Sequence, residues 1–200
     1  MLRDFIADAK ADDTPIMQLR FENETLSETD LSRIDFESVH FIKCRFTACD
    51  FTRTNFYSTL FDSCDISNCV FESSYWKDSK IVNCKAAGSN FSQAHFNGTR
   101  IEGSAFQYAN CIKTWWMNSA VEDSDFKEAF MSDVKIKGLR MNQVNLTRVD
   151  FFKTPLKGVD LSACVIDGIL LSETYAELRG VKVSMEQAAG LAQLLGVQIV

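Results

Sequence analysis

A period of five residues is the feature that most restricts how this chain can fold. Every fifth residue from Leu26 to Leu171 gives a series of 30 positions, and none of them is polar. Twelve of the 16 phenylalanines lie in this series. At 46% hydrophobic content, such a run has a chance probability on the order of 10⁻¹⁰. The repeat is therefore real, and local structure has to be interpreted within it.

A second column lies two residues before each of these large apolar residues. From Thr29 to Ile169 it contains mainly Ser, Thr, Ala, Cys and Val, and it contains no charged residue. A period of five fits neither the 3.6 residues of a helix nor the 2.0 of a plain strand. It fits a chain that turns after each short extended segment, so that the same two positions always point inward. Successive coils can then pair as a parallel sheet, about 4.8 Å apart.

The repeating unit resembles the pentapeptide-repeat motif, which is a small residue, Asp or Asn, Leu or Phe, Ser, Thr or Arg, and Gly. Close matches are Thr29-Asp30-Leu31-Ser32-Arg33, Thr54-Asn55-Phe56, Ser89-Asn90-Phe91-Ser92 and Val159-Asp160-Leu161-Ser162. The resemblance implies an all-β fold, a right-handed, four-sided parallel β-helix with four pentapeptides in each coil. Residues twenty apart should then lie directly above one another. The final Gly is uncommon here, and because that position faces outward its absence does not weaken the expected fold.

Both ends of the repeat carry sequences that suit caps, which a solenoid needs to hide its open edges. Helical spacing links four apolar residues before Pro15: Leu2, Phe5, Ile6 and Ala9. Near the other end, residues 184–187 have the Ser-x-x-Gln pattern of a capping box, which predicts a short helix over about 185–195. We expect one domain made of a cap (1–25), the β-helix (26–175) and a C-terminal capping helix with a tail (176–200).

The cysteines and histidines give little support for catalysis. One cysteine, Cys111, lies in the large inward column, and six lie in the small one: Cys44, Cys49, Cys64, Cys69, Cys84 and Cys164. They could form a metal or redox ladder, but small apolar filling is the simpler interpretation because no His, Asp or Glu shares the interior. His40 and His95 face outward without an evident partner. We expect no enzyme activity, no cofactor and no metal.

Location follows from two further features of the sequence. No stretch approaches the roughly 18 apolar residues of a membrane span. The first residues lack the basic-then-apolar order of a signal peptide. These features predict a cytoplasmic protein that does not bind a membrane.

Two groups of outward apolar residues are candidates for contact with a partner. The face through Phe36, Trp76 and Trp116 should also carry Tyr57, Tyr75, His95, Trp115, Met117 and Tyr175. An exposed aromatic stripe can mark an interface, although aromatic residues can also cover a sheet without any partner. The tail residues Val197, Ile199 and Val200 could pack against the cap or meet their counterparts in a symmetric homodimer.

The family resemblance also implies a more specific function. Qnr- and MfpA-like members mimic duplex DNA and bind DNA gyrase or topoisomerase IV, which protects the enzyme from quinolones or peptide poisons. Mimicry requires an ordered array of negative charge. The net charge is −6, but no predicted face is strongly acidic, although local clusters such as Asp30, Asp35 and Asp50 remain near the N-terminal coils. The unbroken period also leaves no room for projecting loops like those of the Qnr subgroup.

Two functional hypotheses follow. The first is a non-enzymatic rod that binds an unidentified protein through its outer faces or coil ends, without direct nucleic acid binding. The alternative is a bacterial, DNA-mimicking topoisomerase-binding protein of the Qnr or MfpA type. The sequence does not identify the partner.

Overall fold

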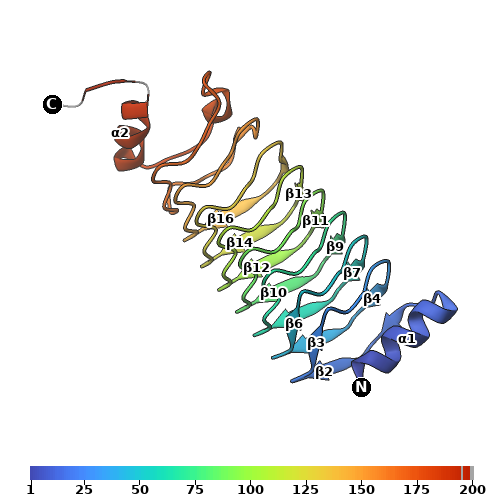
Figure 1. Ribbon diagram of the computed structural model, residues 1–200. Coiled ribbons are helices and arrows are strands. Elements are labelled where there is room, and N and C mark those ends of the chain that lie inside the picture. The colour runs from blue at the N-terminus through green and yellow to red at the C-terminus, as the bar shows by residue number, and fades with distance from the viewer. Residues whose placement is uncertain (195, 199–200) are drawn as a thin grey trace.

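The computed structural model describes residues 1–194 and 196–198. The chain forms a right-handed, four-sided parallel β-solenoid with a helix at each end (Figure 1). This confirms the fold class predicted from the five-residue period. No helix in the described part of the chain is long and apolar enough to cross a membrane.

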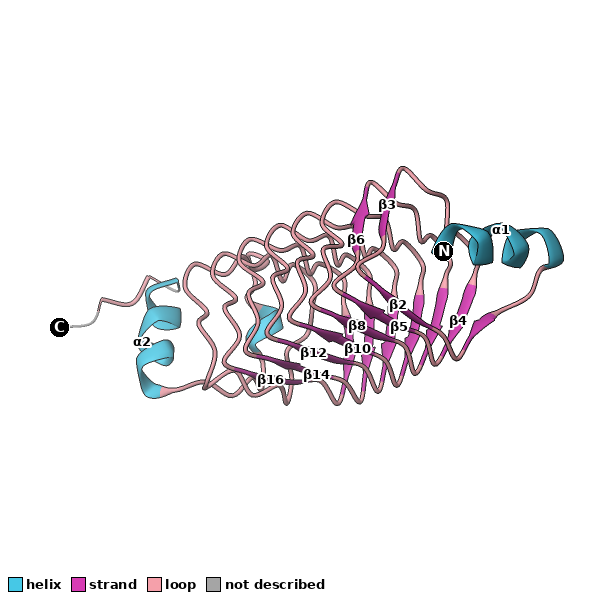
Figure 2. Ribbon diagram, turned by 90° about the horizontal axis from the view of Figure 1, so that it is seen from below, coloured by secondary structure: helices cyan, strands magenta, loops and turns pink. Residues whose placement is uncertain are grey.

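Short strands of successive coils stack along the rod, as Figure 2 shows. The first sheet contains β1 (Ile16–Met17), β4 (Asp35–Glu37), β7 (Asn55–Tyr57), β9 (Tyr75–Lys77), β11 (His95–Asn97), β13 (Trp115–Met117) and β15 (Lys135–Lys137). The second contains β2 (Arg20–Glu22), β5 (His40–Ile42), β8 (Leu60–Asp62), β10 (Lys80–Val82), β12 (Arg100–Glu102), β14 (Ala120–Glu122) and β16 (Arg140–Asn142). The third sheet has only β3 (Thr25–Ser27) and β6 (Arg45–Thr47), and it continues as single bridges.

All strand pairs are parallel, and their partners are twenty residues apart, as in Phe36↔Phe56 and Phe56↔Trp76. Each of the four faces is named here after one large inward residue that it carries. The Trp76 face contains the first sheet and the Ile81 face contains the second. The Phe106 face carries β3 and β6, and the Phe71 face is linked only by bridges such as Asp50↔Val70.

The large inward column fills the shaft with stacked side chains. Phe51, Phe71 and Phe91 stack face to face with ring centroids 4.7 Å apart at each step. In the neighbouring column, the ring centroids of Phe56 and Trp76 lie 4.0 Å apart. Every buried side-chain nitrogen or oxygen in the described part of the chain has a hydrogen-bond partner. The interior is thus closely packed and its buried polar side-chain atoms are hydrogen-bonded, as a stable core requires.

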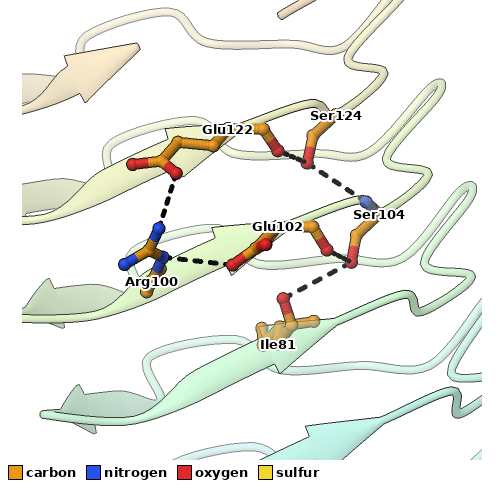
Figure 3. A network of polar contacts seen from close by, with 6 residues as sticks. All are labelled: Ile81, Arg100, Glu102, Ser104, Glu122 and Ser124. Carbon is orange, nitrogen blue, oxygen red and sulfur yellow. Dashed lines mark hydrogen bonds and ion pairs between the residues drawn. The ribbon is translucent and has the colours of Figure 1, made fainter. Parts of the chain in front are cut away.

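The small inward column links the coils at their corners. The Cys84 N–H donates to Ser104 Oγ at 3.0 Å. The Ser104 hydroxyl donates to the Glu102 carbonyl oxygen at 2.9 Å, as Figure 3 shows. Thiols take the same place elsewhere, since the Cys44 N–H donates to Cys64 Sγ at 3.4 Å. The expectation that cysteine is only an apolar filler is incomplete, because it also pairs backbone groups that the turns leave free.

The last position of the repeat is exposed, but its backbone is constrained. From Glu28 to Lys153, the non-glycine residues there have φ between 48° and 60°, with Glu28 and Asp123 at the low end and Gln93 at the high end. This left-handed conformation is easy for glycine and costs other residues roughly 1–2 kcal/mol each. The preference for Gly in the family motif therefore has a conformational cause, although the position faces solvent.

The N-terminal helix covers the first coil. Helix α1 (Leu2–Asp12) buries Leu2, Ile6 and Ala9 against the shaft. Phe5 is partly exposed, and its ring meets Phe21 edge to face at 5.6 Å. The described solenoid begins directly after the helix, with β1.

The C-terminal segment departs from the twenty-residue register. A 3₁₀ helix, η1 (Ala176–Leu178), is followed by pairing of Asp160 with Lys182, which are 22 residues apart. Helix α2 (Met185–Leu194) then begins at a capping box in which Ser184 and Gln187 exchange two hydrogen bonds. The Gln187 amide also donates to the carbonyl oxygens of Leu161 and Cys164 at 2.9 and 2.6 Å. Helix α2 buries none of its described residues, so it touches the open edge without sealing it.

Candidate interaction surfaces

Most of the predicted aromatic residues lie together on the Trp76 face. The rings of Tyr57 and Tyr75 meet edge to face at 5.9 Å, and those of His95 and Trp115 do so at 5.4 Å. The Asn97 amide donates to the Tyr75 hydroxyl oxygen at 3.3 Å. Trp115 is 39% exposed, so the aromatic residues form a paired and partly open surface on a regular sheet.

The remaining members of this group are placed differently. Met117 is half-buried on β13, beside the column that carries Trp115. Tyr175 lies ahead of η1, outside the seven strands, and its hydroxyl donates to the Leu194 carbonyl oxygen at 2.8 Å. Tyr175 therefore fastens α2 to the end of the solenoid, and the strands do not carry it into the aromatic column.

Burial and nearby charge favour the neutral form of the Tyr57 phenol. Partial burial is the main cause that raises its pKa above 10, and the neighbouring Asp35, Tyr75 and Glu37 raise it further. A neutral phenol can both donate and accept a hydrogen bond. The surface thus offers polar ring tips as well as apolar ring faces.

Acids and bases gather at opposite ends of the Trp76 face, with Lys77 between them on β9. The N-terminal strand β4 carries Asp35 and Glu37, whereas the C-terminal strand β15 carries Lys135 and Lys137. None of these four side chains forms an ion pair with the described residues, although the Asn55 amide donates to Asp35 Oδ1 at 2.7 Å.

On the Ile81 face, several acids and bases form ion pairs within a strand or between neighbouring strands. Arg100 forms ion pairs with Glu102 on its own strand at 3.2 Å and with Glu122 on the next coil at 2.6 Å (Figure 3). Arg20 similarly pairs with Glu22 at 3.1 Å. Ion pairs thus neutralise part of the charge on the Ile81 face, whereas the charged residues of β4 and β15 on the Trp76 face have no such pairs among the described residues.

The three predicted acidic residues line one groove of about 800 Å³ beside the end of α1. Asp30 pairs with Lys10, and hydrogen bonds from Lys10 and Ser32 lower the Asp30 pKa to about 2. The lining of the groove also contains Arg33 and Arg53. The structure brings Asp30, Asp35 and Asp50 together, but it surrounds them with bases, so the groove has mixed charge.

A third candidate surface, which was not predicted from the sequence, lies at the C-terminal end of the Phe71 face. Phe130, Phe152 and Leu170 are each at least 42% exposed there. Asp150 lies between Phe130 and Leu170 in the same column. The five-residue pattern marks Phe130 and Phe152 as outward-facing, but it does not give the exposure of each side chain.

The cysteines do not form a ligand site within the described residues. All seven are buried and unbridged, and no group of three His, Cys, Asp or Glu side chains is arranged to hold a metal ion. Burial raises the pKa of Cys111 to about 12. For Cys64 the causes oppose one another: a hydrogen bond with Cys44 lowers its pKa, while one with Cys84 and burial raise it, to about 12 overall. Both thiols therefore stay protonated and unreactive near neutral pH.

The predicted dimer contact at the tail is described only in part. Val197 is 49% exposed and follows α2, and its N–H donates to the Ala192 carbonyl oxygen at 3.2 Å. Ile199 and Val200 lie outside the described residues. A symmetric dimer through this end stays a prediction.

The family is settled by the repeat together with a match to a known sequence model. A model described as a pentapeptide repeat region matches residues 14–91 and also 34–111. The chain belongs to the pentapeptide-repeat family. The search of curated proteins gives no match for this pentapeptide-repeat protein.

Solved structures show the same fold. A trypsin-treated variant of QnrB1, described as a plasmid-mediated fluoroquinolone resistance protein, is 21% identical, with 94% of this chain and 100% of that chain covered and a TM-score of 0.57. A second trypsin-treated QnrB1 variant is also 21% identical, with 93% and 98% covered and a TM-score of 0.54. At this identity the likeness concerns the fold alone.

Proposed function

We propose that this pentapeptide-repeat protein is a non-enzymatic interaction rod and that the Trp76 face is its contact surface. The observation that carries the proposal is the partly exposed aromatic group of Tyr57, Tyr75, His95 and Trp115 on a regular seven-stranded sheet. Aromatic side chains are enriched in protein interfaces because they combine a large apolar area with few rotatable bonds. A rigid shaft holds them in place before binding, which lowers the entropy lost on association.

Alanine substitutions on separate faces test this proposal. The wild type and a Tyr75→Ala/Trp115→Ala variant are immobilised, and protein bound from cell extract is quantified for each. We expect the double variant to lose at least about 90% of specific binding, because aromatic anchors often contribute 2 kcal/mol or more. The matched control is Tyr108→Ala, since Tyr108 is 55% exposed but lies on the Phe106 face.

A further variant separates the two exposed apolar surfaces. Phe130→Ala/Phe152→Ala alters the Phe71 face and leaves the Trp76 face intact. If this variant loses the bound proteins while Tyr75→Ala/Trp115→Ala retains them, the contact surface is on the Phe71 face and the proposal is wrong.

A second candidate function is binding to a bacterial type II topoisomerase in the cytoplasm as a DNA mimic. It is supported by the fold shared with QnrB1 and by the groove that gathers Asp30, Asp35 and Asp50. The three bases of the same groove, Lys10, Arg33 and Arg53, weaken this support because a DNA mimic needs continuous negative charge.

Gyrase supercoiling with the protein titrated in, with and without ciprofloxacin, tests the second candidate. Inhibition or drug protection at low micromolar protein, lost in Asp30→Asn/Asp50→Asn, would support it. The control is Asp123→Asn, which changes an exposed acid on the Ile81 face. Unchanged supercoiling at high protein concentration would exclude this candidate and leave the interaction rod.

A further inference from the structure

The separated charges of the Trp76 face cannot neutralise one another within one chain. Asp35 and Glu37 on β4 lie five coils from Lys135 and Lys137 on β15, because each coil adds one strand to the sheet. Five parallel-strand spacings amount to about 24 Å. Screening in physiological salt acts over about 8 Å, so each end keeps its charge without a partner.

A second copy in the opposite orientation would neutralise both ends at once. A two-fold axis parallel to the strands, placed between two facing sheets, reverses the rod and keeps the strand direction. Centred between β9 and β11, it sets β4 opposite β15. The outward column of Asp35 then faces the column of Lys135, and the column of Glu37 faces that of Lys137.

The remaining positions of the face are also compatible with this arrangement. The axis sets Asn55 opposite Trp115, Tyr57 opposite Met117, Tyr75 opposite His95 and Lys77 opposite Asn97. Like charges are not opposed in these pairs. The turns leave room for the two sheets to approach closely, because a glycine lies opposite a short side chain in two places. Ser38 lies opposite Gly138, and Asp78 lies opposite Gly98. A parallel pair of rods would instead set acid against acid and base against base.

We propose that the Trp76 face binds a second copy of this chain in antiparallel orientation. The inference rests on the proposed function, because it uses the same contact face and names its partner. Six strands of three residues, β4 to β15, give a contact about 10 Å wide and about 24 Å long. This footprint is smaller than that of standard specific interfaces, so the dimer is weak and dissociates on dilution.

Charge reversal at each end provides the test. Sedimentation velocity is run over a range of about 1 to 200 µM protein in low salt, where electrostatic association is strongest. The wild type should dimerise as concentration rises, and about 0.5 M salt should weaken the dimer. Lys135→Glu/Lys137→Glu and Asp35→Lys/Glu37→Lys should each dimerise at least about tenfold more weakly, because both ends then repel.

Mixing the two variants makes the test sharp. One variant has acids at both ends and the other has bases at both ends, so each end of a mixed pair is complementary. The mixture should therefore recover association that neither variant shows alone. The matched control is Lys85→Glu/Lys127→Glu, which changes the net charge by the same amount on the Phe106 face and should dimerise like the wild type.

Cross-linking checks the orientation and does not depend on charge reversal. Copies with Glu37→Cys mixed with copies with Lys137→Cys should form a disulfide-linked dimer under mild oxidation, and neither alone should do so. The seven natural cysteines are buried and do not interfere.

Three results would overturn the proposal: a wild type that stays monomeric throughout, association that survives both charge reversals, or a mixture that does not recover. Dimerisation through the C-terminal tail would survive both charge reversals and would therefore overturn this proposal. The proposed function would still be supported if Tyr75→Ala/Trp115→Ala lost binding of other proteins, so the two proposals can fail separately.

Discussion

The indole N–H of Trp76 donates to the hydroxyl oxygen of Ser74 at 2.8 Å, and both side chains are buried inside the shaft. The Ser74 hydroxyl in turn donates to the Phe71 carbonyl oxygen at 2.7 Å. One small corner residue thereby satisfies the only polar atom that a tryptophan brings into the core. Without it, the indole N–H would be buried and unpaired.

The same relationship recurs two coils further along. Trp116 donates to Thr114 Oγ1 at 3.0 Å, and that hydroxyl is again buried. Between them, Phe96 has no ring donor and is preceded at the same corner by Ala94. Both tryptophans of this column thus follow a hydroxyl residue at the corner, although Thr54 also precedes Phe56, which has no donor.

We expect Ser74→Ala to lower the free energy of unfolding by about 1–3 kcal/mol, because it leaves the Trp76 N–H unsatisfied. In a Trp76→Phe background, which has no such donor, the same change should cost clearly less. Urea denaturation of the four proteins gives this coupling as a double-mutant cycle. Equal costs in both backgrounds would show that the hydrogen bond contributes nothing.

The interior of the fold could be predicted almost completely from the sequence. Each residue in the large column, such as Phe51 or Phe91, must point inward because the period leaves it no other orientation. Register follows as well, because four units in each coil fix partners at twenty residues. The aromatic pairs Tyr57–Tyr75 and His95–Trp115 were predictable for the same reason: both depend only on the phase.

The sequence pattern does not predict structure beyond the end of the five-residue period, nor does it predict the exposure or ion pairing of outward side chains. After Leu171 the period fades, so the insertion of η1 and the resulting displacement of Tyr175 could not be predicted. The pattern also says which positions face outward but not how exposed each side chain is, which is why Phe130 and Phe152 were missed. Local ion pairs, such as that of Asp30 with Lys10, depend on how α1 docks.

Glycines in the left-handed position should differ in how well they tolerate a side chain. Gly158→Ala should cost about 1 kcal/mol, because a Cβ there meets open space and only φ = 81° is unfavourable. Gly98→Ala should cost more, since its Cβ would also overlap Asp78 Oδ1 on the coil below. Urea midpoints of the two variants test this order, and Gly98→Ala/Asp78→Ala should recover the difference.

Cysteine and serine should be interchangeable in the corner column between the Ile81 and Phe106 faces. Cys64 accepts from the Cys44 N–H and donates to the Phe41 carbonyl oxygen at 3.2 Å, the role that Ser104 has further along. Cys64→Ser should therefore change stability by less than about 1 kcal/mol, whereas Cys64→Ala should cost about 1–3 kcal/mol. Thermal and urea unfolding distinguish these outcomes. A serine variant as unstable as the alanine variant would mean that the thiol serves only to fill space.

The buried carboxylate of Glu177 should make the last coil sensitive to acid. Its Oε1 accepts from the Lys153 N–H at 2.8 Å and the Ser172 N–H at 3.3 Å, and its Oε2 accepts from the Ser172 hydroxyl at 2.9 Å. Burial acts to raise the Glu177 pKa, but the hydrogen bonds outweigh it and the pKa lies below 4.5. The unfolded chain therefore binds this proton more readily, so the stabilisation is present above about pH 4.5 and is lost as the pH falls through the folded-state pKa.

Glu177→Gln removes the charge that strengthens these hydrogen bonds and should cost about 1–2 kcal/mol at neutral pH. Amide exchange at Lys153 and Ser172 is the direct measurement, because the loss should appear as faster exchange there and not in the middle of the rod. Lowering the pH from 6 to 3 should accelerate opening of these amides in the wild type, after correction for intrinsic exchange, and have little further effect in the variant. The exposed neighbour Glu173 provides the control, since Glu173→Gln changes the net charge equally without touching these donors. Equal acid sensitivity in wild type and Glu177→Gln would mean that another group holds the last coil together.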